Sequence, residues 1–262
     1  MQELKTMIKF FRKIRQQLIA EKRVSQYLLY ALGEIVLVVA GILIALAINN
    51  GNEQRLTRDK EQVYLKGLQE EFKVSQYKLK NLIALNQQNA EGARTLLGFM
   101  SDSTTLTDEA AFSKLIYSTL AYDIAFNPNN SLLTEMINSG SLRDLSNPEL
   151  RRRLTNWMAT LEDVARQEQD QEQERTRILP TFLSDSYSIR TVLEQTGLAA
   201  NELGLAPSQH APSNLPLLQS RSFENHLLLF LLACAGTTDT HYLPLIEELE
   251  AILKLIHKEV EN

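Results

Sequence analysis

The sequence predicts an all-α protein with an N-terminal interfacial helix, one transmembrane helix and an antiparallel helical bundle outside the cytoplasm. Apolar residues recur at steps of three and four along most of the 262 residues, which is the period of an α-helix. The first proline is Pro128, and such a long stretch without proline suits long helices. Residues 28–48 contain a single charged side chain and are long enough to cross a bilayer.

Residues 1–26 are predicted to form a basic amphipathic segment at the membrane surface. Apolar residues recur at helical spacing from Leu4 to Leu18, and basic residues occupy the other faces. This pattern is typical of a helix that lies in the interface of a lipid bilayer with its basic side on anionic headgroups. The alternative is a plain positive charge signal without fixed structure. The basic residues concerned are Lys5, Lys9, Arg12, Lys13 and Arg15.

Residues 27–50 are predicted to be the transmembrane helix. The apolar run 28–48 would be about 30 Å long as a helix, which matches the hydrocarbon core of a bilayer. A buried core helix of this length would show a polar stripe, and this run has none. The "ALA" at residues 45–47 resembles a signal cleavage site, but the run exceeds the roughly 7–15 residues of a cleaved signal. We therefore expect an uncleaved anchor.

The charge distribution predicts the orientation of this anchor. Residues 1–48 have seven Lys or Arg against three Glu, so their formal charge is +4 and that of the remainder is −9. The basic excess precedes the span, which places the N-terminus in the cytoplasm and residues 51–262 outside the inner membrane. An acidic body on a basic head does not suggest a nucleic-acid partner.

Glu34 is the one acid inside the apolar run. Acids inside spans are costly and usually face protein or water. Helical steps place it on one stripe with small residues that allow two helices to approach closely, and this stripe consists of Glu34, Val38, Gly41, Ala45 and Ile48. We expect a homo-oligomer that assembles through this stripe, with Glu34 protonated or hydrogen-bonded. Contact with another membrane protein, an ion relay, or a tolerated acid near the headgroups are the alternatives.

Residues 51–262 are predicted to form the bundle, and its first half is marked by clear helix boundaries. We interpret "NNGN" (49–52) as hinge-like within a helix nearly continuous with the span, and this helix should end before the loop "SDSTTLTD" (101–108). Thr107 or Asp108 should cap the next helix, which is marked by apolar residues from Phe112 to Ile124. A short helix should end at Gly140.

The second half of the bundle contains three predicted helices. Ser146 or Asn147 should cap a helix with Pro148 in its first turn, running toward Leu179. Its part 166–177 has no hydrophobe and is predicted to be exposed on most sides. Residues 197–216 contain three prolines and are predicted to form a long loop. Two helices, 223–235 and 243–260, should follow, separated at "GTTDTHY", with "LLLFLLACA" in the core.

The sequence contains no pattern that we interpret as catalytic, cofactor-binding or metal-binding. Cys234 is the single cysteine and is predicted to be a small buried residue. The four histidines show no ligand spacing, and the glycines form no phosphate-binding pattern. We interpret the acid clusters 70–71 and 247–250 as solvated helix faces. The basic run 151–153 could bind an anion near a helix start, but a solvated surface run is the favoured interpretation. We therefore expect a protein that is not an enzyme and has no cofactor.

Two blocks of the sequence resemble a known family. They are "IKFFRKIRQQL" with "YLLYALGEIVLVVAGILIALAINNGNEQR" (8–18 and 27–55), and "NPNNSLLTEMINSGSLRDLSNPELRRRLTNW" (127–157). Both are similar to an uncharacterised family of single-span proteins of Bacteroidetes-type bacteria, a domain of unknown function. Family members often have tryptophan where this chain has Gly51. The resemblance implies the bacterial inner membrane, and the family has no known activity that could be carried over to this chain.

Taken together, these patterns predict a scaffold, assembly or signalling protein that acts through protein contacts. One rival is a ligand-sensing bundle with a pocket near Tyr122, Asn127 and Arg143. The other is a stator-like ion-coupling subunit that uses Glu34.

Overall fold

The computed structural model describes residues 24–101 and 108–261, and in these ranges it is helical without a strand, as predicted. The predicted interfacial segment, including Lys5, Lys9, Arg12, Lys13 and Arg15, lies outside the described residues. The helices longer than one turn are α2 (Val24–Ser101), α3 (Glu109–Leu120), α4 (Ser131–Ser139), α5 (Pro148–Ile178), α6 (Ile189–Gln195), α8 (Arg221–Gly236) and α9 (Leu243–Glu261).

The chain divides into two compact units, 1–60 and 61–262. Within the first unit, α2 is unbroken through residues 49–52, so the predicted hinge is wrong and the predicted near-continuity is right. Local bonds support the helix here: Asn49 Nδ2 donates to Glu53 Oε1 at 2.9 Å, and Thr57 Oγ1 donates to the Glu53 carbonyl at 3.0 Å. Asparagine and glycine weaken a helix by at most about 1 kcal/mol each, and the contact between Asn49 and Glu53 offsets part of that cost.

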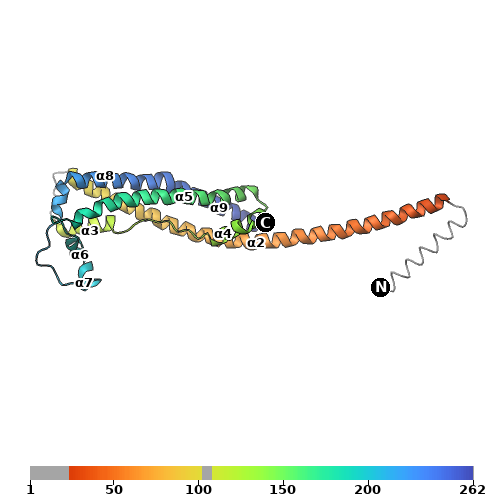
Figure 1. Cartoon of the computed structure of the whole chain (residues 1–262), viewed down its shortest axis with the longest axis horizontal. Helices are drawn as coiled ribbons and strands as arrows, with labels where there is room; N and C mark the ends of the chain where they lie inside the picture. The colour runs from red at the N-terminus through yellow and green to blue at the C-terminus, as the bar shows by residue number, and fades with distance from the viewer. Residues whose placement is uncertain (1–23, 102–107, 262) are drawn as a thin grey trace. The chain divides into compact units, whose positions relative to one another are not determined.

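The second unit is a helical bundle in which α5 packs along α8 and α9 (Figure 1). The predicted separation of the last two helices at "GTTDTHY" is wrong. Residues Thr237–Tyr242 form a π-helical turn that joins α8 to α9, and Leu243 N–H donates to the Thr238 carbonyl across it. Pro244 follows in the first turn of α9, where a residue without an N–H interrupts fewest bonds.

Local capping signals positioned three helices correctly. Asp108 accepts from Ala110 N–H at 3.0 Å at the start of α3, and Asn147 accepts from Leu150 N–H at 3.0 Å at the start of α5. Gly140 ends α4 with φ of 75°, a left-handed conformation that favours glycine. Ser146, the alternative cap, instead donates to buried Glu61.

Two apolar clusters form the core of the bundle. The first is built mainly from α2, α5 and α9 and includes Phe72 and Trp157, whose ring centroids are 5.2 Å apart. The second is built mainly from α2, α3 and α8 and includes Phe112 and Phe230. Helices α2 and α3 approach each other closely at Gly92. A Cβ atom added there would lie only 2.1 Å from Thr119 Oγ1. Glycine at this position therefore permits the contact.

The segment 197–216 is less irregular than predicted. It begins with the short helix α7 (Leu198–Asn201), and the 3-10 helix η3 (Leu215–Gln219) follows it. Buried Asn214 fixes the return of the chain: its side chain accepts from Ser188 N–H and donates to the Ser188 carbonyl, both at 2.8 Å. The spacing of apolar residues in the sequence does not indicate that the Asn214 side chain bonds to the backbone of Ser188 in this way.

Candidate functional site

The apolar part of α2 has its side chains on the surface. Its large hydrophobic residues between Leu28 and Ile48 are 46–76% exposed. Among the described residues, α2 is the one helix long and apolar enough to cross a membrane, and none of its most apolar window is buried. A core helix of the same composition would be covered by protein, whereas this one has the length, composition and exposure that a membrane span would have.

The five residues of the predicted stripe all lie in this exposed helix. Val38 and Ile48 are 54% and 69% exposed, and Glu34 is half-buried. A Cβ added at Gly41 would meet nothing within 4 Å, so the surface beside it is open to the backbone of an approaching helix. Glu34, Val38, Gly41, Ala45 and Ile48 follow one another at steps of three or four residues, which keeps them on one face.

The bundle contains a layer of buried polar groups, which we call the polar layer: Asn86, Glu168, Gln171, Thr237 and Tyr242, together with Cys234. Asn86 Nδ2 donates to the Cys234 carbonyl and to Thr238 Oγ1, each at 2.9 Å, and Asn86 Oδ1 accepts from Gln171 Nε2 at 2.7 Å. These bonds connect α2 and α5 to the π-helical turn. Helical turns of this kind often occur at functional sites.

Glu168 occupies the same layer at 7% exposure. Its Oε1 accepts from Tyr242 Oη at 2.5 Å and from Phe126 N–H at 2.8 Å. Burial raises the pKa of the Glu168 carboxyl, and the two hydrogen bonds oppose that effect. Burial also raises the pKa of the Tyr242 hydroxyl, and the bond to Glu168 adds to it. The phenol therefore stays a donor, and the carboxyl is the group that can change its charge.

The prediction that residues 166–177 are exposed on most sides is wrong at two positions. Glu168 and Gln171 are buried, because their partners lie on distant segments: Phe126 and Tyr242 for the acid, Asn86 for the amide. The prediction that "LLLFLLACA" lies in the core is right for some of its residues and wrong for others. Leu227, Phe230 and Cys234 are buried, whereas Leu228, Leu229 and Leu232 are 43–68% exposed. A helix that is apolar on all sides does not reveal which face meets the core.

Cys234 is fully buried, as predicted, and burial raises its pKa to about 12. A thiol this hard to deprotonate is a poor nucleophile. His226 is partly buried on α8, and His257 lies near the end of α9, where Nε2 is 3.2 Å from Glu261 Oε1. Neither arrangement suggests a metal ligand.

The acid clusters and the basic run are solvated only in part: Glu70, Glu247, Glu250 and Arg152 are exposed as predicted, whereas the others are partly buried. Glu71 accepts from Leu132 N–H at 2.8 Å and so caps α4 from a different helix, where Asn130 makes no side-chain capping bond. Glu248 pairs with Arg153. In the basic run, Arg152 and Arg153 both bond to Glu149, while Arg151 donates to the Arg143 carbonyl. The bonds of Glu71, Glu248 and Arg151 therefore join different elements of the bundle, whereas those of Glu149 are made within α5.

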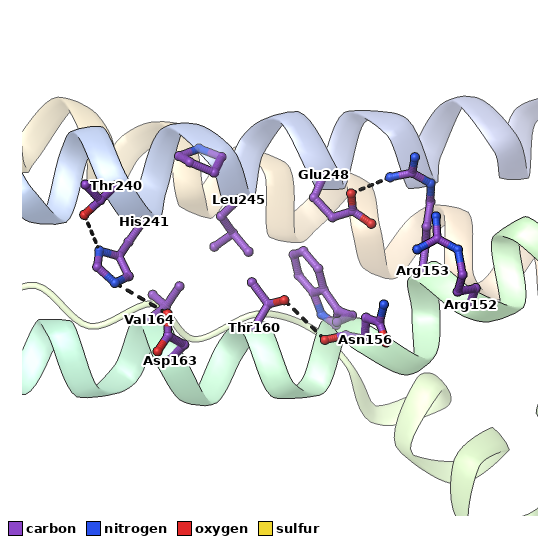
Figure 2. A pocket seen from close by; sticks show the side chains of 12 residues that line it. Arg152, Arg153, Asn156, Thr160, Asp163, Val164, Thr240, His241, Leu245 and Glu248 are labelled. Carbon is purple, nitrogen blue, oxygen red and sulfur yellow. Dashed lines mark hydrogen bonds and ion pairs between the residues drawn. The ribbon is translucent and has the colours of Figure 1, made fainter.

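A groove of about 300 Å³ lies between α5 and the segment formed by the π-helical turn and α9 (Figure 2). Arg152 and Arg153 stand at one end, and His241 and Asp163 stand at the other, with His241 Nε2 3.5 Å from Asp163 Oδ2. This volume is at the lower limit of small-molecule sites. Sequence reasoning missed this groove because its walls come from residues about 90 positions apart.

The pocket expected near Tyr122, Asn127 and Arg143 does not form as predicted. Asn127 lines a shallow hollow with Lys78 and Leu82, and Lys78 Nζ donates to the Asn127 carbonyl at 2.9 Å. Neither Tyr122 nor Arg143 lines that hollow, and the Arg143 side chain is 86% exposed. The hollow at Asn127 therefore does not include the other two residues of the expected pocket.

Residues 34–162 match the model of a family of unknown function (DUF6090). The match begins at Glu34 in the apolar part of α2 and ends within α5, so it contains both the predicted stripe and Trp157. The resemblance to an uncharacterised family is thereby confirmed. Comparison with curated proteins and with solved structures gives no match.

Proposed function

We propose that this chain, whose residues 34–162 match a family of unknown function (DUF6090), is a single-pass inner-membrane protein that acts through protein contacts. The observation that carries the proposal is the exposed apolar surface of α2 between Leu28 and Ile48. Transfer of such side chains from water to an apolar phase yields roughly 25 cal/mol per Å². Lipid is the surrounding that fits an apolar helix of this length.

The basic residues before the span support a cytoplasmic N-terminus and a bundle on the periplasmic side. Seven Lys or Arg precede the apolar run, and they also favour contact with anionic headgroups. The bundle itself has a large surface on which partner proteins can act. In this arrangement the chain serves as a scaffold, an assembly factor or a signalling component.

In this proposal the chain also self-associates, and the contact between copies is made by the stripe of Glu34, Val38, Gly41, Ala45 and Ile48. Small residues allow close helix contact, and a carboxyl group inside a bilayer is stabilised by a hydrogen-bonding partner. A different membrane protein could occupy the same face, and a stator-like role would require a multi-span partner. Self-association needs no component beyond the chain itself.

We expect Glu34→Ala and Gly41→Leu to weaken self-association by about tenfold each, which corresponds to the 1–2 kcal/mol typical of such membrane contacts. The measurement is the oligomer fraction after cross-linking in native membranes, with sizing in mild detergent. Val36→Ala and Ala47→Leu are the controls, because they introduce the same residues, alanine and leucine, on the opposite face of the helix. If all four variants assemble like the unmodified chain, this stripe is not the interface.

A further inference from the structure

The groove in Figure 2 has unused hydrogen-bonding capacity at its basic end. Arg152 bonds Glu149 through Nε and Nη2, and Arg153 uses Nε for Glu149 and Nη1 for Glu248. Within residues 24–101 and 108–261, Arg152 Nη1, Arg153 Nη2 and Glu248 Oε1 have no hydrogen-bond partner. Two guanidinium donors and one carboxylate acceptor are thus available side by side.

Trp157 supplies a second, independent observation. It lines the groove at 1% exposure, and its indole Nε1 has no hydrogen-bond partner among the described residues. An indole N–H can only donate, and buried donors in folded proteins nearly always find an acceptor. Trp157 lies one helical turn from Arg153 on the same face of α5, and both residues line the groove together with Arg152.

The middle of the groove is apolar on the side of Leu245. Leu245 and Thr160 lie between the two charged ends, and Val164 lies near Asp163 and His241 (Figure 2). Asn156 and Trp157 also line the groove. Pro244 lines the opposite wall, and it has no N–H to donate to the π-helical turn before it. The groove therefore offers a charged end that can bind both signs of charge, followed by a short apolar section.

We infer that this groove binds a small zwitterion of the α-amino acid class with an apolar side chain. The carboxylate would accept from Arg152, Arg153 and the indole N–H, and the ammonium would donate to Glu248 Oε1. The side chain would lie against Leu245. Charge-assisted bonds from a guanidinium pair suit a carboxylate, and the adjacent acid selects against anions that lack an ammonium group. This inference concerns the bundle alone and does not depend on the membrane helix.

The test uses the full chain in detergent micelles and the emission of Trp157, the single tryptophan of the sequence. We expect L-leucine, L-methionine or L-phenylalanine to produce a saturable change with a Kd of about 1 mM or lower. Isocaproate, which lacks the ammonium, and isopentylamine, which lacks the carboxylate, should bind at least about tenfold more weakly than L-leucine.

Variants locate the site. Arg152→Gln and Glu248→Gln should weaken binding about tenfold or more, because each removes one charged partner. Arg151→Gln and Glu247→Gln make the same changes one position away, outside the groove, and should bind like the unmodified chain. Circular dichroism of each variant confirms that it is folded.

Two results would overturn the inference. The first is that no amino acid produces a saturable change in Trp157 emission up to about 10 mM. The indole N–H of Trp157 would then bond to a buried water or have no acceptor, and it would not mark a ligand site. The other is equal affinity for isocaproate and L-leucine, or equal binding by all four variants, because a zwitterion site at this end requires both charges.

Discussion

Two arginines placed in the middle of the apolar run, Val39→Arg with Leu43→Arg, are expected to release the chain from the membrane. Each arginine at the centre of a span costs about 2.5–3.5 kcal/mol on insertion scales, so the pair costs roughly 5–7 kcal/mol. Both side chains are exposed, at 46% and 59%, so the change creates no clash within the chain. The measurement is the share of protein in the membrane pellet.

The matched control places the same two arginines elsewhere on α2. Val63 and Tyr77 are 71% and 69% exposed and belong to the bundle unit, so arginine there should leave the pellet fraction unchanged. Val39 and Leu43 also lie away from the Glu34 stripe, which separates insertion from assembly. A double variant that stays in the pellet as fully as the unmodified chain would show that this run does not hold the protein there.

Glu168→Leu is expected to destabilise the bundle by about 2–5 kcal/mol. The change leaves two donors, Phe126 N–H and Tyr242 Oη, without their acceptor, and each unmet buried group costs about 1–3 kcal/mol. Glu168→Gln keeps an oxygen acceptor and should cost much less. Chemical denaturation measures the difference, and Asp170→Leu on the exposed side of α5 is the control. A loss for Glu168→Leu no greater than that for Asp170→Leu would contradict the role of the polar layer.

The same acid predicts a pH dependence. Burial raises the pKa of Glu168 in the folded state above its ordinary value, so the neutral acid is the better-tolerated form. Its contribution is fully present below the unfolded-state pKa and is lost as pH rises through the folded-state pKa. The unmodified chain should therefore lose stability relative to Glu168→Gln as the pH rises from about 4. Parallel denaturation curves over that range would contradict this assignment.

Features set by neighbouring residues could be predicted from the sequence. Asp108, Asn147 and Gly140 mark helix ends through bonds or backbone angles within a few residues, and the structure has all three where expected. The apolar run was evident for the same reason, because its length and composition alone distinguish it. Fold class followed from these local signals and from the helical period.

Features set by distant partners could not be predicted. Gln171 is polar within a polar stretch, and only Asn86, 85 residues away in sequence, explains why it is buried. Glu71 appears as a surface acid until α4 is folded against it. The groove beside Trp157 needs both α5 and α9, so neither segment alone indicates it. The π-helical turn escaped prediction because "GTTDTHY" has the composition of a loop.

The central claim is that residues 28–48 lie in the lipid bilayer of the mature protein. It is tested most directly by alkaline carbonate extraction of native membranes, followed by the intact mass of the extracted chain. We expect the protein in the pellet, with a mass that includes the apolar run and the residues before it. A soluble protein whose mass begins near Ile48 would contradict the claim, because the run would then be a removed signal.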